Sequence, residues 1–186
     1  MQLVIGCDLN QFKSYYEKTI SSPDYRGTVG ESNGTTELNY VAQNPSHVIL
    51  WKDEDRILGH AIWHESNTDE HKTGDPRDED DRELLSKLLG GKREFVELHE
   101  VWLRKEQRGK GYGEQFFQFF ERFISKRGHD AIVYYAFDNA AVAICRRRGY
   151  KEEYGAKAAG KTCWVFYLNL KKSGRSSRGV QREFPR

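Results

Sequence analysis

A glycine-rich turn in the second half of the sequence has the composition of an anion-binding site. It reads Gln107-Arg-Gly-Lys-Gly-Tyr-Gly113 and stands between a predicted strand and a predicted helix. Glycines allow the main chain to turn tightly and to approach a phosphate closely, and the first N–H groups of a helix point outward at the positive end of its dipole. Arg108 and Lys110 add charge-assisted hydrogen bonds of about 1.5–3 kcal/mol each. The turn is therefore predicted to bind a diphosphate.

Two common nucleotide-binding patterns do not fit this turn. A P-loop requires Gly-x4-Gly-Lys followed by Ser or Thr, and the dinucleotide fingerprint requires Gly-x-Gly-x-x-Gly. Glu114 stands three residues after Gly111, where the fingerprint needs glycine. These spacings disfavour a nucleoside triphosphate and NAD as ligands. The remaining alternative to a diphosphate site is a turn whose basic side chains are simply solvated.

A carboxylate and an imidazole in the preceding strand could carry acid–base chemistry. Glu97 and His99 lie two positions apart, so strand alternation places both side chains on one face. Val101 and Leu103 are expected to continue that face, whereas Glu100 faces the other way unless a β-bulge shifts the phase. Glu97 and His99 could accept or relay a proton as a pair. Either residue could instead be a solvent-facing strand residue or a satisfied core group.

Hydrophobic periodicity and turn residues predict the elements that position these groups. After the glycine-rich turn, phenylalanines at i, i+3, i+4 and i+7 predict a helix with one buried aromatic face. The predicted elements are a strand at 2–6, a helix capped by Asp8 with Leu9, Phe12, Tyr16 and Ile20 on its apolar side, loop or a broken helix over 21–46, hairpin strands at 47–52 and 57–64, a helix near 80–89, a strand at 95–103, the helix of Phe116, Phe119, Phe120 and Phe123, a strand at 131–137, a helix at 138–148 and a strand at 163–170.

The composition indicates one folded domain in solution. A chain of 186 residues with 37% hydrophobic and 31% charged residues can bury a core and is too aromatic to be disordered. No run approaches the roughly 18 apolar residues of a membrane span, and the first residues lack a signal-peptide pattern. Cys7, Cys145 and Cys163 lack the spacing of a zinc site or a disulfide framework. We expect reduced thiols, no metal and a cytoplasmic protein without a membrane partner.

The net charge of +2 hides two biased segments. Residues 171–186 carry six Lys or Arg against one Glu, and we expect this tail to be disordered and dispensable beside a domain over 1–170. Residues 65–94 carry ten acidic and six basic residues, and we read them as a charged insertion before the strand of Glu97. This insertion could attract a cationic substrate or be a solvated surface loop.

The turn and its flanking elements resemble the GNAT superfamily of N-acetyltransferases. The family signature, Arg/Gln-x-x-Gly-x-Gly/Ala between the fourth strand and the third helix, is matched by Arg108, Gly111 and Gly113. The segment 138–150 looks like the later family helix that ends in Gly-Phe or Gly-Tyr, so the resemblance covers 95–170. It implies an α/β (α+β) acyltransferase fold, a mixed central sheet of about six to seven strands flanked by about four helices.

The resemblance also implies a place for acetyl-CoA as co-substrate. In the family, the pantetheine arm lies along the strand before the turn and the pyrophosphate lies on the turn itself. The implied cofactor contacts are the main chain of Val101, Trp102 and Leu103, the turn residues Arg108, Gly109, Lys110, Gly111, Tyr112 and Gly113, and the side chain of Asn139.

For catalysis, the resemblance implies direct transfer of the acetyl group to an amine. Glu97 aligns with the glutamate that serves as base in the histone-acetylating branch, with His99 beside it. Many members carry a tyrosine as general acid five residues before the Gly of the Gly-Phe/Tyr pair. Counting back from Gly149 gives Ile144, or Cys145 with one residue of ambiguity, and neither is tyrosine. Replacement acids are Cys145, Tyr150, Tyr154 or water.

Two other function classes fit the same sequence. One is a catalytically silent acyl-CoA-binding or regulatory domain of this fold, which the missing tyrosine permits. The other is a nucleic-acid or protein-binding module that uses the basic tail, although the charge of the tail is weak for nucleic acid. The identity of the acceptor amine stays open, with a cationic amine and a homodimeric enzyme both compatible with the sequence.

Overall fold

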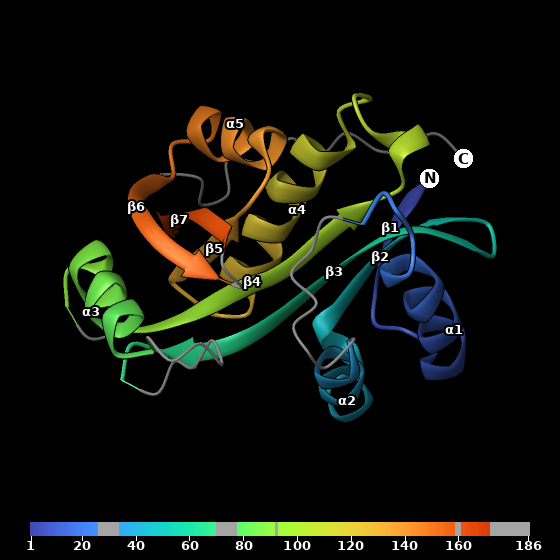
Figure 1. Cartoon of the computed structure of the whole chain (residues 1–186), viewed down its shortest axis with the longest axis horizontal. Helices are drawn as coiled ribbons and strands as arrows, with labels where there is room; N and C mark the ends of the chain where they lie inside the picture. The colour runs from blue at the N-terminus through green and yellow to red at the C-terminus, as the bar shows by residue number, and fades with distance from the viewer. Residues whose placement is uncertain (26–33, 70–77, 92, 159–160, 172–186) are drawn as a thin grey trace.

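The structure is a computed structural model that describes residues 1–25, 34–69, 78–91, 93–158 and 161–171. Its centre is a seven-stranded sheet in the order β1-β2-β3-β4-β5-β7-β6, flanked by helices on both faces (Figure 1). The strands are β1 Gln2–Ile5, β2 Val48–Asp53, β3 Arg56–Asn67, β4 Glu94–Leu103, β5 Ala131–Ala136, β6 Lys151–Ala158 and β7 Lys161–Asn169. The helices are α1 Leu9–Ile20, α2 Thr35–Gln43, α3 Asp78–Leu89, α4 Tyr112–Lys126 and α5 Asn139–Arg147, with short 3-10 turns at Pro45–His47 and Lys105–Gln107.

The sheet is mixed because one pair of neighbours runs parallel. β4 and β5 are parallel, and the other five neighbouring pairs are antiparallel. The connection from β4 to β5 contains the glycine-rich turn and α4, as a parallel crossover requires. The predicted α/β fold with a mixed central sheet is therefore confirmed.

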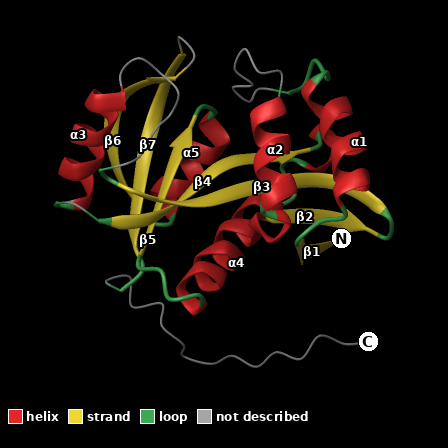
Figure 2. Ribbon diagram, turned by 90° about the horizontal axis from the view of Figure 1, so that it is seen from below, coloured by secondary structure: helices red, strands yellow, loops and turns green. Residues whose placement is uncertain are grey.

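Helices cover the two faces of the sheet differently. α4 and α5 pack on one face, over the core that includes Val96, Leu98 and Phe166. On the other face, α1 and α2 cover β2, β3 and the end of β4, whereas α3 covers Phe95 and strands β5 and β7. Figures 1 and 2 show α3 at the opposite end of the molecule from α1 and α2. The middle of β4 lies between these two covered regions.

Local interactions explain two of the predicted helices, α1 and α4. The Asp8 side chain accepts from the Gln11 amide at 2.8 Å and caps α1 as predicted. In α4, the buried aromatic face consists of Phe116, Phe117 and Phe120, each at 1% exposure or less. Phe119 and Phe123 are only partly buried, so the predicted face is rotated toward Phe117. Burial of each phenylalanine in this face contributes about 1.5–3 kcal/mol.

Several predicted segments differ from the structure. The region 21–46, read as loop or a broken helix, contains α2, and strand β6 follows Tyr150 where no strand is predicted. The charged segment 65–94 is more than an insertion, because its first residues extend β3 and its helix buries Leu85, Leu88 and Leu89. The basic tail lies outside the described residues apart from its first position. No helix in the described part of the chain is long and apolar enough to cross a bilayer.

Candidate functional site

A β-bulge in the middle of β4 sets the orientation of the site residues. Glu100 pairs with Ile62 and Leu98 pairs with Trp63, which leaves His99 as the extra residue. Beyond the bulge the phase is shifted, so Glu100 lies on the same face as Glu97. The sequence predicts that Glu100 faces the other way unless a β-bulge shifts the phase, and the structure contains that bulge.

The same bulge changes the residues that follow His99. Trp102 packs with the α1 and α2 core, whereas Val101 and Leu103 pack against the core on the α4 side. The prediction that Val101 and Leu103 continue the face of Glu97 and His99 is wrong. The sequence pattern alone could not reveal this, because the extra residue is defined by pairing with β3.

β4 and β5 separate beyond the bulge and leave room for a ligand. Their pairing covers only Val96–Leu98 and Ile132–Tyr134, although both strands continue. A cavity of about 990 Å³ opens where they part. Of the predicted site residues, the cavity is lined by His99, Val101, Trp102, Leu103, Arg108, Gly109, Gly111, Tyr112, Gly113 and Asn139.

The glycine-rich turn presents an open cradle to this cavity. Gly109 and Gly111 adopt left-handed φ values of 75° and 82°, and a β-carbon on either would meet no other heavy atom within 4 Å. Gly111 is the N-cap of α4 and supplies no side-chain cap, so the first amides of the helix remain available to a ligand. Gly113 permits close helix packing, because a β-carbon there would lie 3.0 Å from Ile144 Cδ1.

The two basic side chains of the turn have protein partners. Arg108 Nε donates to the Leu103 carbonyl at 2.8 Å, and its guanidinium lies 5.9 Å from the Trp102 ring centre. Lys110 Nζ donates to Gln107 Oε1 at 3.2 Å, and Lys110 is missing from the described lining of the cavity. The structure thus brings together every predicted cofactor residue except Lys110.

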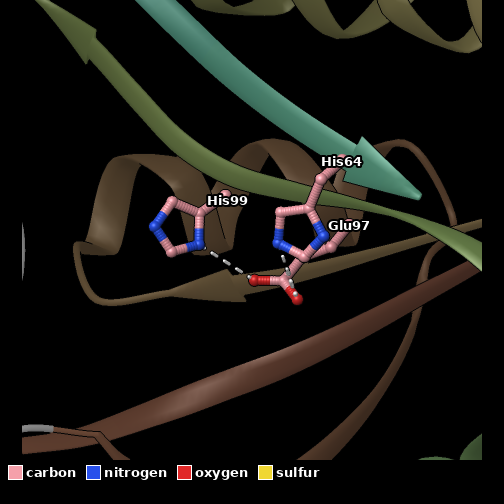
Figure 3. Close-up of side chains that lie close together, drawn as sticks. All are labelled: His64, Glu97 and His99. Atoms are coloured by element: carbon pink, nitrogen blue, oxygen red, sulfur yellow. Dashed lines mark hydrogen bonds and ion pairs between the residues drawn. The ribbon is translucent and has the colours of Figure 1, made fainter. Parts of the chain in front are cut away.

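Glu97 is the centre of a polar cluster on the face opposite α4. Its side chain is 7% exposed, and its carboxylate contacts His99 Nδ1 at 3.3 Å and His64 Nε2 at 3.5 Å (Figure 3). His64 comes from β3, where it pairs directly with Glu97 across the strands. On the far side of the His99 ring, Nε2 lies 3.7 Å from Glu37 Oε1 of α2. The predicted Glu97–His99 pair is therefore part of a four-residue chain.

The contacts of His99 with Glu37 and Glu97 favour its positively charged form. Burial alone acts to lower the pKa of the imidazole, but hydrogen bonds to Glu37 and Glu97 outweigh it and raise the pKa of His99 to about 10. The carboxylates on the two sides of the ring therefore favour its protonated, imidazolium form. An imidazolium cannot accept a further proton, so Glu97 is the stronger base candidate of the pair.

A second network holds Glu100 next to the cavity. Glu100 accepts from Tyr16 Oη at 2.9 Å, from Tyr25 Oη at 2.7 Å and contacts His60 Nε2 at 2.8 Å. Tyr15 Oη contacts the other ring nitrogen of His60 at 2.9 Å. Burial acts to raise the pKa of Glu100, but His60 and the tyrosine hydroxyls hold that pKa below its usual value. The network therefore keeps an anionic carboxylate on the cavity wall.

Comparison with protein families decides the class of this fold and site. A model of the acetyltransferase (GNAT) family matches residues 15–150. The chain belongs to the GNAT family. No curated protein sequence matches it.

Solved structures of GNAT proteins share the fold. The polyamine N-acetyltransferase of Drosophila melanogaster matches with a TM-score of 0.61 and 13% identity, covering 90% of this chain and 100% of that chain. A putative GNAT acetyltransferase of Desulfovibrio desulfuricans gives a TM-score of 0.62 at 12% identity, covering 91% and 99%. A mosquito arylalkylamine N-acetyltransferase-like protein gives 0.60 at 14%, covering 90% and 99%. At these identities the likeness shows the fold alone.

The position of the usual GNAT acid is occupied by core residues. Cys145 is fully buried among the residues of the α4 side, and burial raises the pKa of its thiol. Tyr150 is also buried in that core, where burial raises the pKa of its hydroxyl. Neither lines the described cavity. The side chain of Tyr154 lies outside the described residues.

Sequence reasoning missed Glu37, His60 and His64. His60 and His64 lie four positions apart in one strand, so their shared face was available as a signal. Glu37 lies in the segment read as loop or broken helix, and no local pattern connects it to β4.

Proposed function

We propose that this GNAT protein is an acetyl-CoA-dependent N-acetyltransferase that moves an acetyl group directly to an amine, with Glu97 as the base. The observation that carries the proposal is the buried Glu97 carboxylate, which contacts His99 where His99 lines the cavity between β4 and β5. The family and the structural neighbours support acyl transfer to an amine.

The chain offers suitable groups for the donor. Acetyl-CoA supplies an activated acetyl thioester when it is bound. Gly109 and Gly111 leave open space at the start of α4, where a pyrophosphate can approach the helix amides. The indole N–H of Trp102 is buried without a hydrogen-bond partner in the described residues, and Trp102 lines the cavity. An unpaired buried donor is costly, so a bound acceptor group there is favourable.

The acid–base roles follow from the charges in the cluster. The acceptor amine must lose a proton to become nucleophilic, and a carboxylate within hydrogen-bond reach can accept it. Glu97 takes that role through one bridging water, because it lies beside His99 but outside the described lining of the cavity. His99 and Glu37 orient the carboxylate and His64 supports its other oxygen. His99, Glu37 and His64 are therefore positioning residues in this scheme.

The charge of the wall favours a cationic acceptor. Glu100 lines the cavity, and the described tyrosines and His60 keep it ionised. Glu37 and Glu97 lie behind the wall, on the two sides of the His99 ring. Carboxylates on and just behind a cavity wall attract an ammonium ion. We also propose a cytoplasmic setting, which the three free cysteine thiols support.

The proposal is tested with a panel of amines and acetyl-CoA, with the acetylated product measured by mass spectrometry. The panel includes polyamines, arylalkylamines, an N-terminal peptide and a lysine peptide. Acetylation of at least one amine, together with saturable CoA binding in calorimetry, is the expected result. CoA binding without turnover on any amine would instead identify a silent acyl-CoA-binding domain.

A further inference from the structure

Three side chains of the kind that ligate transition metals point toward one another on the face opposite α4 (Figure 3). His64, Glu97 and His99 each offer one ligand atom, and these atoms all lie within 4.8 Å of one another. Two imidazoles and one carboxylate form a ligand set that zinc uses in open protein sites. Cys-x-x-Cys spacing could not predict this set, because it contains no cysteine and its members come from two strands.

The contacts of Glu97 with the two histidines are close to the spacing of zinc ligands. Zinc binds histidine nitrogen and carboxylate oxygen at about 2.0–2.2 Å, so neighbouring ligands of a tetrahedral ion lie about 3.3 Å apart. Glu97 Oε1 lies 3.3 Å from His99 Nδ1, and Glu97 Oε2 lies 3.5 Å from His64 Nε2. The side chains of His64 and His99 are 25% and 40% exposed, so both rings have room to adjust.

The second ring nitrogen of each histidine already has an acceptor. His99 Nε2 lies 3.7 Å from the Glu37 carboxylate, and His64 Nδ1 lies 3.5 Å from the main-chain carbonyl of Glu65. Histidines that bind metals commonly donate this second N–H to a carboxylate or a backbone carbonyl, which fixes the tautomer. The contacts leave Nδ1 of His99 and Nε2 of His64 directed at Glu97.

The fold also holds the ligands in place and leaves an access path. His64 and Glu97 are direct partners in the β3–β4 ladder, and His99 is the bulged residue. His99 lines the cavity, so a fourth ligand position on that side can take water or an amine. Histidine binds zinc as a neutral imidazole, so zinc binding at this site is expected to release protons and to strengthen as pH rises.

We infer that His64, Glu97 and His99 form a binding site for Zn²⁺, and that zinc in this site blocks acyl transfer. The blocking part rests on the proposed function, because a metal bound to Glu97 occupies the lone pair that would accept the amine proton. The inference that zinc binds to these residues does not depend on the proposed function.

Binding is tested on the chelator-treated full chain by calorimetry with ZnCl₂ and by the visible spectrum of the Co²⁺ form. We expect one zinc per chain and the intense absorption bands of four-coordinate cobalt. His64→Ala and His99→Ala each weaken zinc affinity at least tenfold, and Glu37→Gln weakens it about 10–100-fold. The matched control is His129→Ala, which removes another histidine paired with a carboxylate, at 3.1 Å from Glu65, and leaves affinity unchanged.

Circular dichroism and a thermal melt verify that each variant is folded. The site is overturned if the wild type binds no zinc stoichiometrically, or if folded His64→Ala and His99→Ala variants retain wild-type affinity. Inhibition is measured by mass spectrometry of the acetylated amine, since the thiol of released CoA itself binds zinc. A zinc-loaded enzyme with full activity refutes the blocking role. An inactive protein that binds zinc as described refutes the proposed function and leaves the metal site standing.

Discussion

The substitution Glu97→Gln separates base catalysis from cofactor binding. Glutamine keeps the shape of glutamate but cannot accept the amine proton. Loss of a general base typically lowers turnover by about 10²–10⁴, which raises the barrier by roughly 2.7–5.4 kcal/mol. Acetyl-CoA affinity is expected to stay unchanged, because Glu97 is absent from the described lining of the cavity.

The structure places the loss near the lower end of that range. The pKa of His99 is about 10 because hydrogen bonds to Glu37 and Glu97 outweigh burial. Replacing Glu97 by a neutral amide removes one of these two carboxylates, so the pKa of His99 falls. Deprotonated His99 then becomes a substitute base beside Glu37, at 3.7 Å. The double variant Glu97→Gln/His99→Ala is therefore expected to lose more activity than Glu97→Gln alone.

The assay measures kcat and KM on the best acceptor across a range of pH. The wild-type rate should rise with pH, because the base and the acceptor amine must both be deprotonated. Glu97→Gln should move the lower-pH limb to higher pH, where His99 loses its proton, and Glu97→Gln/His99→Ala should remove it. Glu65→Gln is the matched control, because it neutralises a glutamate of the neighbouring strand β3 that also pairs with a histidine, His129, but is 58% exposed. If Glu97→Gln turns over at the wild-type rate, the base is elsewhere and the assignment is refuted.

Three further outcomes are expected. Gly111→Val should weaken CoA binding in calorimetry, because a side chain would project into the cradle from a residue with φ of 82°; unchanged affinity would exclude the turn as the pyrophosphate site. Glu121→Ala should lower the free energy of unfolding in urea by about 1.5–3 kcal/mol, because it removes the carboxylate that accepts from the largely buried Arg148 at 2.6 Å and 2.7 Å and leaves Glu114, at 2.8 Å, as the remaining carboxylate partner; a loss below 1 kcal/mol would contradict this. Cys7 should react with iodoacetamide at pH 8 about a hundredfold more slowly than a free thiol and faster as pH rises, because burial and then Asp8 raise its pKa to about 11; rapid labelling by mass spectrometry at pH 8 would oppose this.

Some features of this protein are determined by short stretches of sequence. The cradle at Gly109 and Gly111 depends on residues that adopt positive φ, and the helix after it depends on a run of phenylalanines. The Asp8 cap involves an amide only three residues away. Such interactions are encoded locally, so periodicity and turn chemistry could predict the cofactor turn, most helices and the mixed sheet.

Tertiary structure alone decided how the catalytic face is built. The phase of β4 changes at His99 because of its pairing with β3, and this turns Glu100 toward Glu97 and moves Val101 and Leu103 to the other face. His64 and Glu37 reach the cluster from β3 and α2, far from Glu97 in the sequence. A single chain records alternation within a strand but not its register against a neighbour, and a shift of one residue reverses every following side chain. The charge of His99 has the same origin, since it depends on carboxylates that only the fold brings to the two sides of one ring.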